Sequence, residues 1–195
     1  MRKNKEVMWF NMKGNCRAFT LIEMIIVISI LVVLLSIAIP NYLLFSEKAE
    51  IDRVTKEIAS MITQMYGKIE SELAYYKYFV VINNWAKEND NGEKYLEVKF
   101  IKRDEGNQIK ILKTLVSRKV VLESNKVSTQ RLTVITYDNR LRYCISEADS
   151  ETTIFLSSYS PTQGDTVIEI KGKGHSTFKR KIIIKEIPPG SVLIE

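Results

Sequence analysis

A single carboxylate, Glu23, lies within a long apolar stretch of this 195-residue chain. From Phe19 to Ile39 the apolar residues are interrupted only by Thr20, Glu23, Ser29 and Ser36. A charged side chain at the centre of a bilayer costs about 2.5–3.5 kcal/mol on insertion scales, and less toward the interface. An anchor with no other role would be better served by leucine at this position. We therefore expect Glu23 to have a positively charged partner in the same membrane.

The stretch from Phe19 to Ile39 has 21 residues, enough for a helix to cross a bilayer. Residues 1–18 before it carry five Lys or Arg and one Glu, a net charge of +4. By the positive-inside rule this leader stays cytoplasmic and the C-terminal part of the chain is exported. A secretory signal peptide is the alternative, and Ser36-Ile37-Ala38 weakly fits its cleavage pattern. Its apolar core is usually shorter, about 7–15 residues, and has no use for Glu23.

Elsewhere the sequence offers no recognisable catalytic or metal-binding pattern. The only histidine, His175, lies in a Gly-Lys-Gly-His-Ser-Thr turn. Without neighbouring cysteines or suitably spaced acids it cannot form a metal site by itself. No nucleophile elbow, phosphate-binding loop or metalloprotease helix motif is present. We therefore expect that the protein is not an enzyme and uses no cofactor or metal.

The block Phe19-Thr20-Leu21-Ile22-Glu23, behind a short basic leader, resembles a known processing site. It is similar to that of type IV prepilins and of the pseudopilins of type II secretion and DNA-uptake systems, over Arg17 to Tyr42. The resemblance implies that a prepilin peptidase cuts between Ala18 and Phe19 and methylates the new amino group of Phe19. The family usually has glycine where this chain has Ala18. Because alanine is the next smallest residue, we expect processing to survive.

The resemblance also implies assembly roles for Glu23 and Pro40. Glu23 corresponds to the glutamate that pairs with the free N-terminal amine of another subunit during assembly. Pro40 corresponds to a proline that often bends the helix, and a proline within a helix predicts a kink on steric grounds alone. The implied partners are a prepilin peptidase, other pilin or pseudopilin subunits and an inner-membrane assembly platform.

A helical pattern continues past Pro40. Apolar residues recur at steps of three and four, at Ile51, Val54, Ile58, Met61, Ile62, Met65, Ile69 and Leu73. Charged residues lie between them, and Asp52–Lys56 and Arg53–Glu57 have the i,i+4 spacing of helical ion pairs. We expect an amphipathic helix whose apolar stripe packs on the exported domain.

After Tyr75 the sequence changes to short β-rich runs separated by turn signals. The predicted strands are Tyr75–Ile82, Tyr95–Ile101, Ile109–Leu115, Lys119–Glu123, Arg131–Tyr137, Leu141–Ile145, Thr153–Leu156, Thr166–Lys171, Lys179–Lys185 and Val192–Ile194. The predicted fold is α+β: a long N-terminal helix, membrane-spanning in its first half and bent near Pro40, packed on a C-terminal antiparallel β-sheet domain. The expected organisation is a leader removed on processing (1–18), a transmembrane and assembly helix (19–42), its amphipathic continuation (43–74) and an exported β-rich domain (75–195).

Two basic segments, residues 99–126 and 171–185, raise the question of nucleic-acid binding. The chain as a whole has a net charge of +6, but without the leader 24 basic and 22 acidic residues remain, a net charge of +2. A DNA-binding face would use phosphate contacts from basic residues, the candidates being Lys171, Lys173, Lys179, Arg180 and Lys181. Stacking surfaces could come from Tyr75, Tyr76 and Tyr78. The competing interpretation is that alternating strand positions expose solvated lysines and bury the aromatic residues.

The two cysteines differ in their expected fate. Cys16 lies in the leader and would be lost on cleavage, so the processed chain would form no internal disulfide. Cys144 lies in a strand-like run, which predicts a buried strand residue, the alternative being a reactive or intermolecular thiol.

The C-terminal third adds a looser resemblance to the closing strands of H-type minor pseudopilins and their competence-pilus relatives. It rests on Gly164–Ile170, Lys181–Ile184 and Gly190–Ile194. Together these features favour a structural, minor subunit of a type IV pilus or a type II secretion pseudopilus. The alternatives are a DNA-receptor minor pilin of a competence pilus and an unprocessed single-span membrane protein with an exported β-domain.

Overall fold

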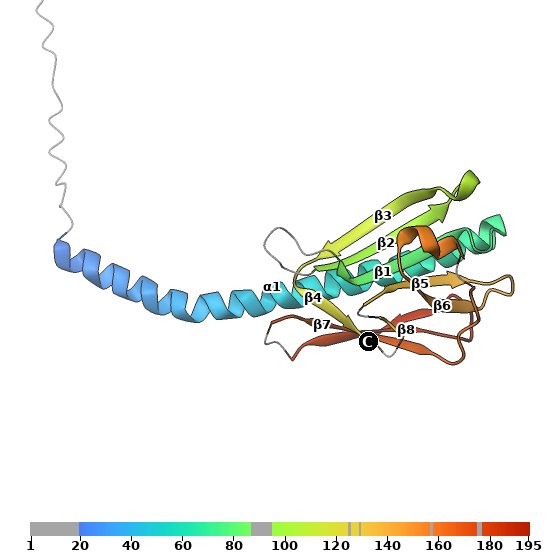
Figure 1. The fold of residues 1–195 in the computed structure, drawn as a ribbon. Coiled ribbons are helices and arrows are strands. Elements are labelled where there is room, and N and C mark those ends of the chain that lie inside the picture. The colour runs from blue at the N-terminus through green and yellow to red at the C-terminus, as the bar shows by residue number, and fades with distance from the viewer. Residues whose placement is uncertain (1–19, 87–94, 125, 129, 157, 175–176) are drawn as a thin grey trace, which may run out of the picture. The chain divides into compact units, whose positions relative to one another are not determined.

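A long helix and two antiparallel sheets make up the fold (Figure 1). The computed structural model describes residues 20–86, 95–124, 126–128, 130–156, 158–174 and 177–195. The chain divides into two compact units, Met1–Asn41 and Tyr42–Glu195, and helix α1 (Leu21–Glu72) contributes to both. Pro40 lies inside α1, and the bend there stays a prediction. The helix packed on antiparallel sheets confirms the predicted α+β class.

The second half of α1 forms the centre of the core of the second unit. The predicted apolar stripe is buried at Ile51, Val54, Ile58, Met61, Ile62, Met65 and Ile69. Leu73 was predicted to belong to this stripe, but its side chain is 70% exposed. The helix ends at Glu72, where Leu73 turns left-handed with a φ of 50° and the Ala74 N–H bonds the Ile69 carbonyl at 3.2 Å. This is the Schellman termination, which usually places glycine where this chain has Leu73.

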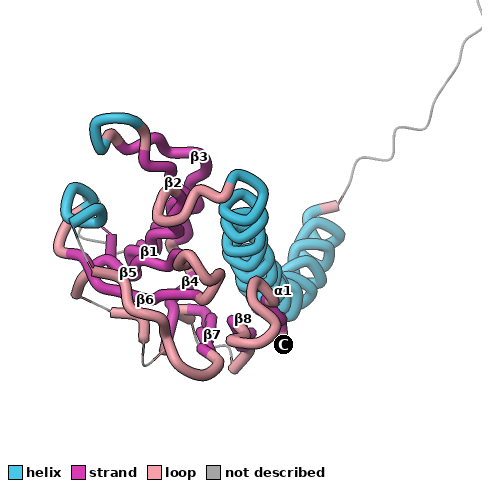
Figure 2. The backbone as a smooth tube through the Cα atoms, turned by 90° about the vertical axis from the view of Figure 1, so that its right-hand side faces the viewer, coloured by secondary structure: helices cyan, strands magenta, loops and turns pink. Residues whose placement is uncertain are grey.

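The strands form two sheets beside this half of α1 (Figure 2). The first sheet has the order β3 (Ile109–Ser117), β2 (Tyr95–Arg103), β1 (Tyr78–Ala86), β5 (Leu132–Tyr137) and β6 (Tyr143–Ala148). The second has the order β4 (Val120–Glu123), β7 (Thr166–Gly172), β8 (Lys179–Ile184) and β9 (Val192–Ile194). All pairs are antiparallel. Both sheets contribute apolar residues to the core around α1.

The predicted strand Thr153–Leu156 is wrong, because this segment belongs to the 3₁₀ helix η2 (Glu151–Leu156). Thr153 turns the chain there by donating its hydroxyl to the Ser150 carbonyl at 2.8 Å and accepting the Ser150 N–H at 3.0 Å. The turn places buried Ile154 in a second apolar cluster with Phe79 and Val134 of the first sheet. A short helix covers this side of the sheet, where the sequence predicted a further strand. A shorter 3₁₀ turn, η1 (Glu105–Asn107), joins β2 to β3.

The predicted strand Tyr75–Ile82 begins too early. The chain makes a turn before β1 starts at Tyr78, and Tyr76 has a φ of 54°. Bulky residues rarely adopt this conformation, so the residue types gave no sign of it. Every other predicted strand except Thr153–Leu156 overlaps an observed one.

The two predicted helical ion pairs are wrong as direct contacts, because Asp52, Arg53 and Glu57 make their ion pairs with other residues. Asp52 pairs with Arg180 of β8 at 2.7 Å. Arg53 pairs with Glu50 at 2.8 Å, and Glu57 with Lys113 of β3 at 3.5 Å. Two of these contacts join α1 to the sheets, so the charges of the helix serve the tertiary fold.

A buried amide connects the two sheets. Asn84 lies in β1, past the predicted end of that strand, and is 2% exposed. Its Nδ2 donates to the carbonyl of Leu122 in β4 at 2.7 Å, and the Leu122 N–H donates to Oδ1 at 3.0 Å. One side chain thus satisfies both backbone groups of a residue in the other sheet.

Candidate assembly and processing site

Glu23 has a partner within its own chain. Thr20 directly precedes α1, and its backbone N–H and its hydroxyl both donate to Oε2 of Glu23 at 2.8 Å. The Glu23 N–H in turn lies 3.3 Å from the Thr20 hydroxyl oxygen. This is a capping box, in which two side chains satisfy backbone donors at the start of a helix. The spacing Thr-x-x-Glu is visible in the sequence and is typical of this cap, which the charge of Glu23 alone does not indicate.

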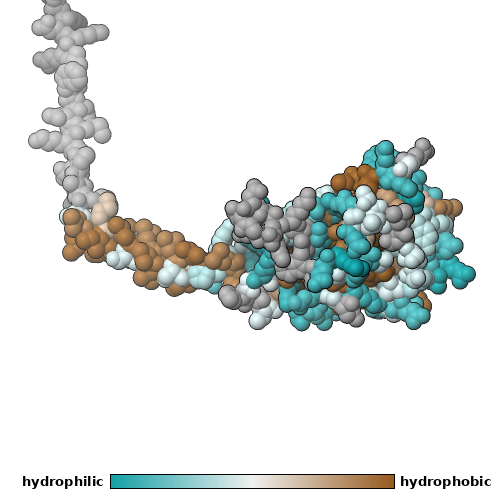
Figure 3. Space-filling model, in the orientation of Figure 1, coloured by the Kyte–Doolittle hydropathy of each residue, from teal (hydrophilic) through white to brown (hydrophobic). Residues whose placement is uncertain are grey.

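The first part of α1 presents apolar side chains on all sides. It is the stretch of the described chain that is long and apolar enough to cross a membrane, and none of its most apolar window is buried (Figure 3). The hydroxyls of Ser29 and Ser36 donate to the carbonyls of Ile25 and Val33, each at 2.7 Å. These hydroxyls are therefore satisfied inside the helix. Glu23 is the only charged side chain between Phe19 and Ile39.

The other predicted processing residues, Ala18 and Phe19, lie outside the described residues, as do Cys16 and His175. The cleavage position and the methylation of Phe19 therefore stay predictions. Pro40 is placed within α1, 17 positions after Glu23 in the chain.

The basic residues proposed for DNA contact are engaged with acids of the same domain. Lys179 and Lys181 lie 3.3 and 3.6 Å from the carboxylate of Glu169. Arg180 faces α1 and pairs with Asp52. The pairs with Glu169 join β8 to β7, and the pair with Asp52 joins β8 to α1, as expected of residues with a structural role.

The remaining DNA candidates are also held by neighbours. Lys171 forms an ion pair with Glu123 across the β4–β7 ladder. The backbone N–H of Lys173 donates to the Lys119 carbonyl at 2.8 Å. Of the three tyrosines, Tyr78 is buried and bonds Glu72, whereas Tyr75 and Tyr76 are half-buried. A role of these residues in DNA contact stays a prediction.

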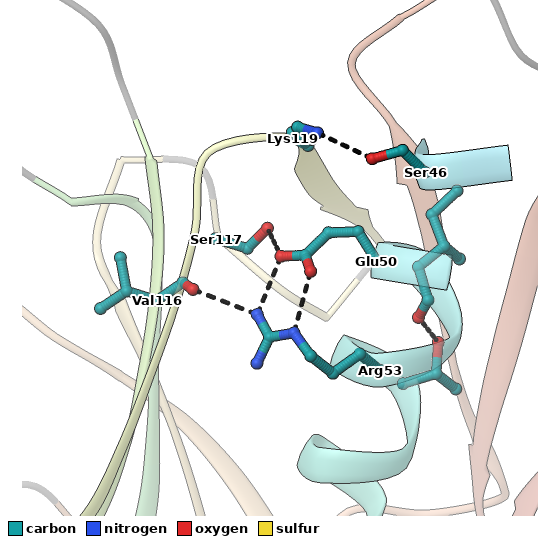
Figure 4. A network of polar contacts seen from close by, with 8 residues as sticks. Ser46, Glu50, Arg53, Val116, Ser117 and Lys119 are labelled. Carbon is teal, nitrogen blue, oxygen red and sulfur yellow. Dashed lines mark hydrogen bonds and ion pairs between the residues drawn. The ribbon is translucent and has the colours of Figure 1, made fainter. Parts of the chain in front are cut away.

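Sequence reasoning missed a polar network where α1 meets the turn between β3 and β4 (Figure 4). Glu50 accepts two hydrogen bonds from the Arg53 guanidinium, each at 2.8 Å, and one from the buried Ser117 hydroxyl at 2.7 Å. Arg53 also reaches the Val116 carbonyl at 3.4 Å. The hydrogen bond from Arg53 lowers the pKa of Glu50, so this carboxylate stays ionised at neutral pH. Glu50 and Ser117 lie 67 positions apart, so no local pattern could reveal the contact.

Cys144 is a buried residue of β6, which confirms the predicted strand residue. Burial raises the pKa of its thiol to about 11. At about pH 8 only about one thiol in a thousand would therefore be ionised, and the thiolate is the reactive form.

We therefore expect Cys144 of the folded, processed chain to resist iodoacetamide at about pH 8, since burial and a raised pKa both suppress thiolate attack. Labelling counted by mass spectrometry should be at least about ten-fold slower than in the guanidinium-unfolded chain. The Cys144→Ser variant gives the background. Equal labelling rates in folded and unfolded chain would show that the thiol is accessible.

A comparison with protein-family models finds the prokaryotic N-terminal methylation motif at residues 13–39. The match confirms the predicted resemblance of this N-terminal segment to the processing motif of type IV prepilins and pseudopilins. Proteins with this motif are generally structural subunits and not enzymes. No curated protein and no solved structure matches the chain.

Proposed function

We propose that the protein is a structural subunit, of the minor kind, of a type IV pilus or a type II secretion pseudopilus. The observation that carries this proposal is the methylation motif on a helix whose apolar surface contains one charge, Glu23. A filament that assembles from membrane-held subunits needs both features: a helix soluble in lipid and a charge that selects its neighbour. The basic residues of β7 and β8 support a structural over a DNA-receptor role, because they pair with acids.

Before processing, the subunit is held in the cell membrane as a single-pass protein. The basic leader, with its net charge of +4, stays on the cytoplasmic side and the β-domain lies outside. Thr20 and Glu23 then cap the start of the helix. A prepilin peptidase cuts between Ala18 and Phe19 and methylates the exposed amine.

Cleavage creates a positive charge that Glu23 can attract. In a low-dielectric surrounding the carboxylate and the amine of a neighbouring subunit attract each other far more strongly than in water. Pairing also removes two unpaired charges from the apolar layer, where each is costly. Correct axial placement of the incoming subunit is therefore favoured over simple burial in lipid. The exposed apolar helices then form the centre of the filament.

The processing step gives a direct prediction. Chains purified from cells that contain a prepilin peptidase should begin at Phe19 and carry one additional methyl group on that residue. Sequencing of the N-terminal peptide by mass spectrometry checks both. Cells without the peptidase serve as the control, because there the leader should remain. Chains that still begin at Met1 when the peptidase is present would rule out the proposed processing.

A further inference from the structure

A cavity of about 640 Å³ opens at the beginning of the second unit, between α1 and the turn that joins β3 to β4. On the helix side its wall includes Tyr42, Phe45 and Arg53, and on the turn side Val116, Arg118 and Lys119. The cavity thus has apolar and basic walls and belongs to neither the core nor the processing motif.

The apolar wall is exposed to an unusual degree for aromatic residues. Tyr42 is 70% exposed and Phe45 is 69% exposed, and Val116 across the cavity is 45% exposed. Exposed apolar side chains grouped beside polar ones are typical of binding surfaces. Within the described chain, nothing covers these three side chains.

The basic wall has an excess of positive charge. Glu50 at the base of the cavity is already neutralised by Arg53 and bonded by Ser117 (Figure 4). Lys119 donates a hydrogen bond to the Ser46 hydroxyl at 3.1 Å, and its charge also attracts Glu50, whose carboxylate already accepts two hydrogen bonds from Arg53. Arg118 is exposed and forms no ion pair with any residue that the structure describes. The two cations at the turn are therefore available to an anion.

The position of the cavity residues in the chain indicates which anion lies near the cavity. Tyr42 and Phe45 follow the last residue of the apolar stretch, Ile39, by three and six positions. At a rise of about 1.5 Å per residue this is roughly 5–9 Å of helix, comparable to the headgroup layer on one side of a bilayer. Tyrosine is commonly found at this depth on both sides of a membrane. Lipid headgroups are thus permanently close to the cavity of the membrane-held subunit.

We propose that this cavity binds an anionic phospholipid, with the phosphate held by Arg118 and Lys119 and the glycerol and upper acyl chain lying along Tyr42, Phe45 and Val116. A guanidinium offers two parallel N–H donors to a phosphate, and an ammonium adds a second point charge. The proposal depends on the proposed function only for the membrane anchor. It adds a lipid partner that would hold the domain against the membrane before assembly.

The test uses the full-length chain purified in detergent and titrated with dioleoylphosphatidylglycerol or dioleoylphosphatidylcholine, with bound lipid counted by native mass spectrometry. We expect the anionic lipid to be retained at least about ten-fold better, a free-energy difference of about 1.4 kcal/mol. The double variant Arg118→Gln/Lys119→Gln should lose this preference. The control Lys110→Gln/Arg140→Gln removes the same charges from two other exposed residues and should keep it.

Two further arms separate a lipid from other ligands. Phe45→Ser should weaken retention of the anionic lipid several-fold, and inorganic phosphate should not displace it, because the apolar wall contributes to binding. Equal retention of both lipids, an unchanged Arg118→Gln/Lys119→Gln variant, or full displacement by inorganic phosphate would overturn the proposal. The proposal would also be overturned if a photoreactive residue placed at Val116 cross-linked a second copy of the chain in membranes but did not cross-link lipid. Circular dichroism confirms that each variant is folded, and methylation of Phe19 is measured independently of all these outcomes.

Discussion

Replacing Glu23 by glutamine is expected to lower incorporation into filaments at least about ten-fold, while the exported domain stays folded. Glutamine can still close a capping box with Thr20, so the start of the helix is preserved. What the variant loses is the charge that would pair with the amine of a neighbouring subunit. Loss of a charge pair in a low-dielectric setting costs a few kcal/mol, about 3–5, and each 1.4 kcal/mol is about ten-fold in population.

The measurement is the fraction of the chain that sediments with sheared filaments, compared with the amount in membranes. Thr20→Ala is the matched control, because it removes the capping hydroxyl and leaves the charge of Glu23. We expect this control to assemble at close to the normal level. If both variants lose assembly equally, the cap is what matters; if Glu23→Gln assembles normally, the charge has no role.

Asn84→Ala is expected to destabilise the β-domain by about 2–6 kcal/mol. The change leaves the buried N–H and C=O of Leu122 without the partners that Asn84 supplies. Each unsatisfied buried polar group costs about 1–3 kcal/mol. Urea unfolding of the full-length chain in detergent, followed by the β-sheet signal in circular dichroism, measures the shift of the midpoint.

Asn139→Ala is the control for this experiment. Asn139 is exposed in the turn between β5 and β6, and such substitutions usually change stability by less than about 0.5 kcal/mol. A loss below about 1 kcal/mol for Asn84→Ala would mean that water or a shift of β4 replaces the amide contacts.

The periodicity of apolar residues predicted the elements of this fold, because the buried faces of α1 and of the strands carry apolar residues at regular spacing. The stripe from Ile51 to Ile69 is buried as expected. The errors in the predicted element boundaries occur where the backbone adopts conformations that the residue types do not indicate. Leu73 and Tyr76 adopt left-handed conformations normally taken by glycine or asparagine, and η2 depends on two hydroxyl contacts around Ser150.

The candidate site could be predicted only in its local part. The position of Glu23 in an apolar stretch is a property of neighbouring residues, and the Thr20 cap was equally visible in the sequence. The contacts of Glu50 with Ser117 and of Asp52 with Arg180 join residues 67 and 128 positions apart. Only the folded chain decides such pairs, which is why Asp52 and Arg53 do not form the helical pairs that their spacing indicated.

The shared use of α1 determines when its apolar stripe can be covered during the proposed export of the domain. On the proposed topology, the segment from Ile51 to Ile69 emerges early, yet its apolar stripe is covered partly by Ile168 and Ile182, which lie 99 to 131 positions later. Non-local closure of this kind is slow because loop entropy is lost before the contacts form. Until β7 and β8 have been translocated, the apolar stripe is an exposed hydrophobic surface on the outside of the cell. A nascent subunit therefore needs a chaperone or the membrane surface itself to shield it, and a water-soluble fragment for biochemistry must begin upstream of Ile51.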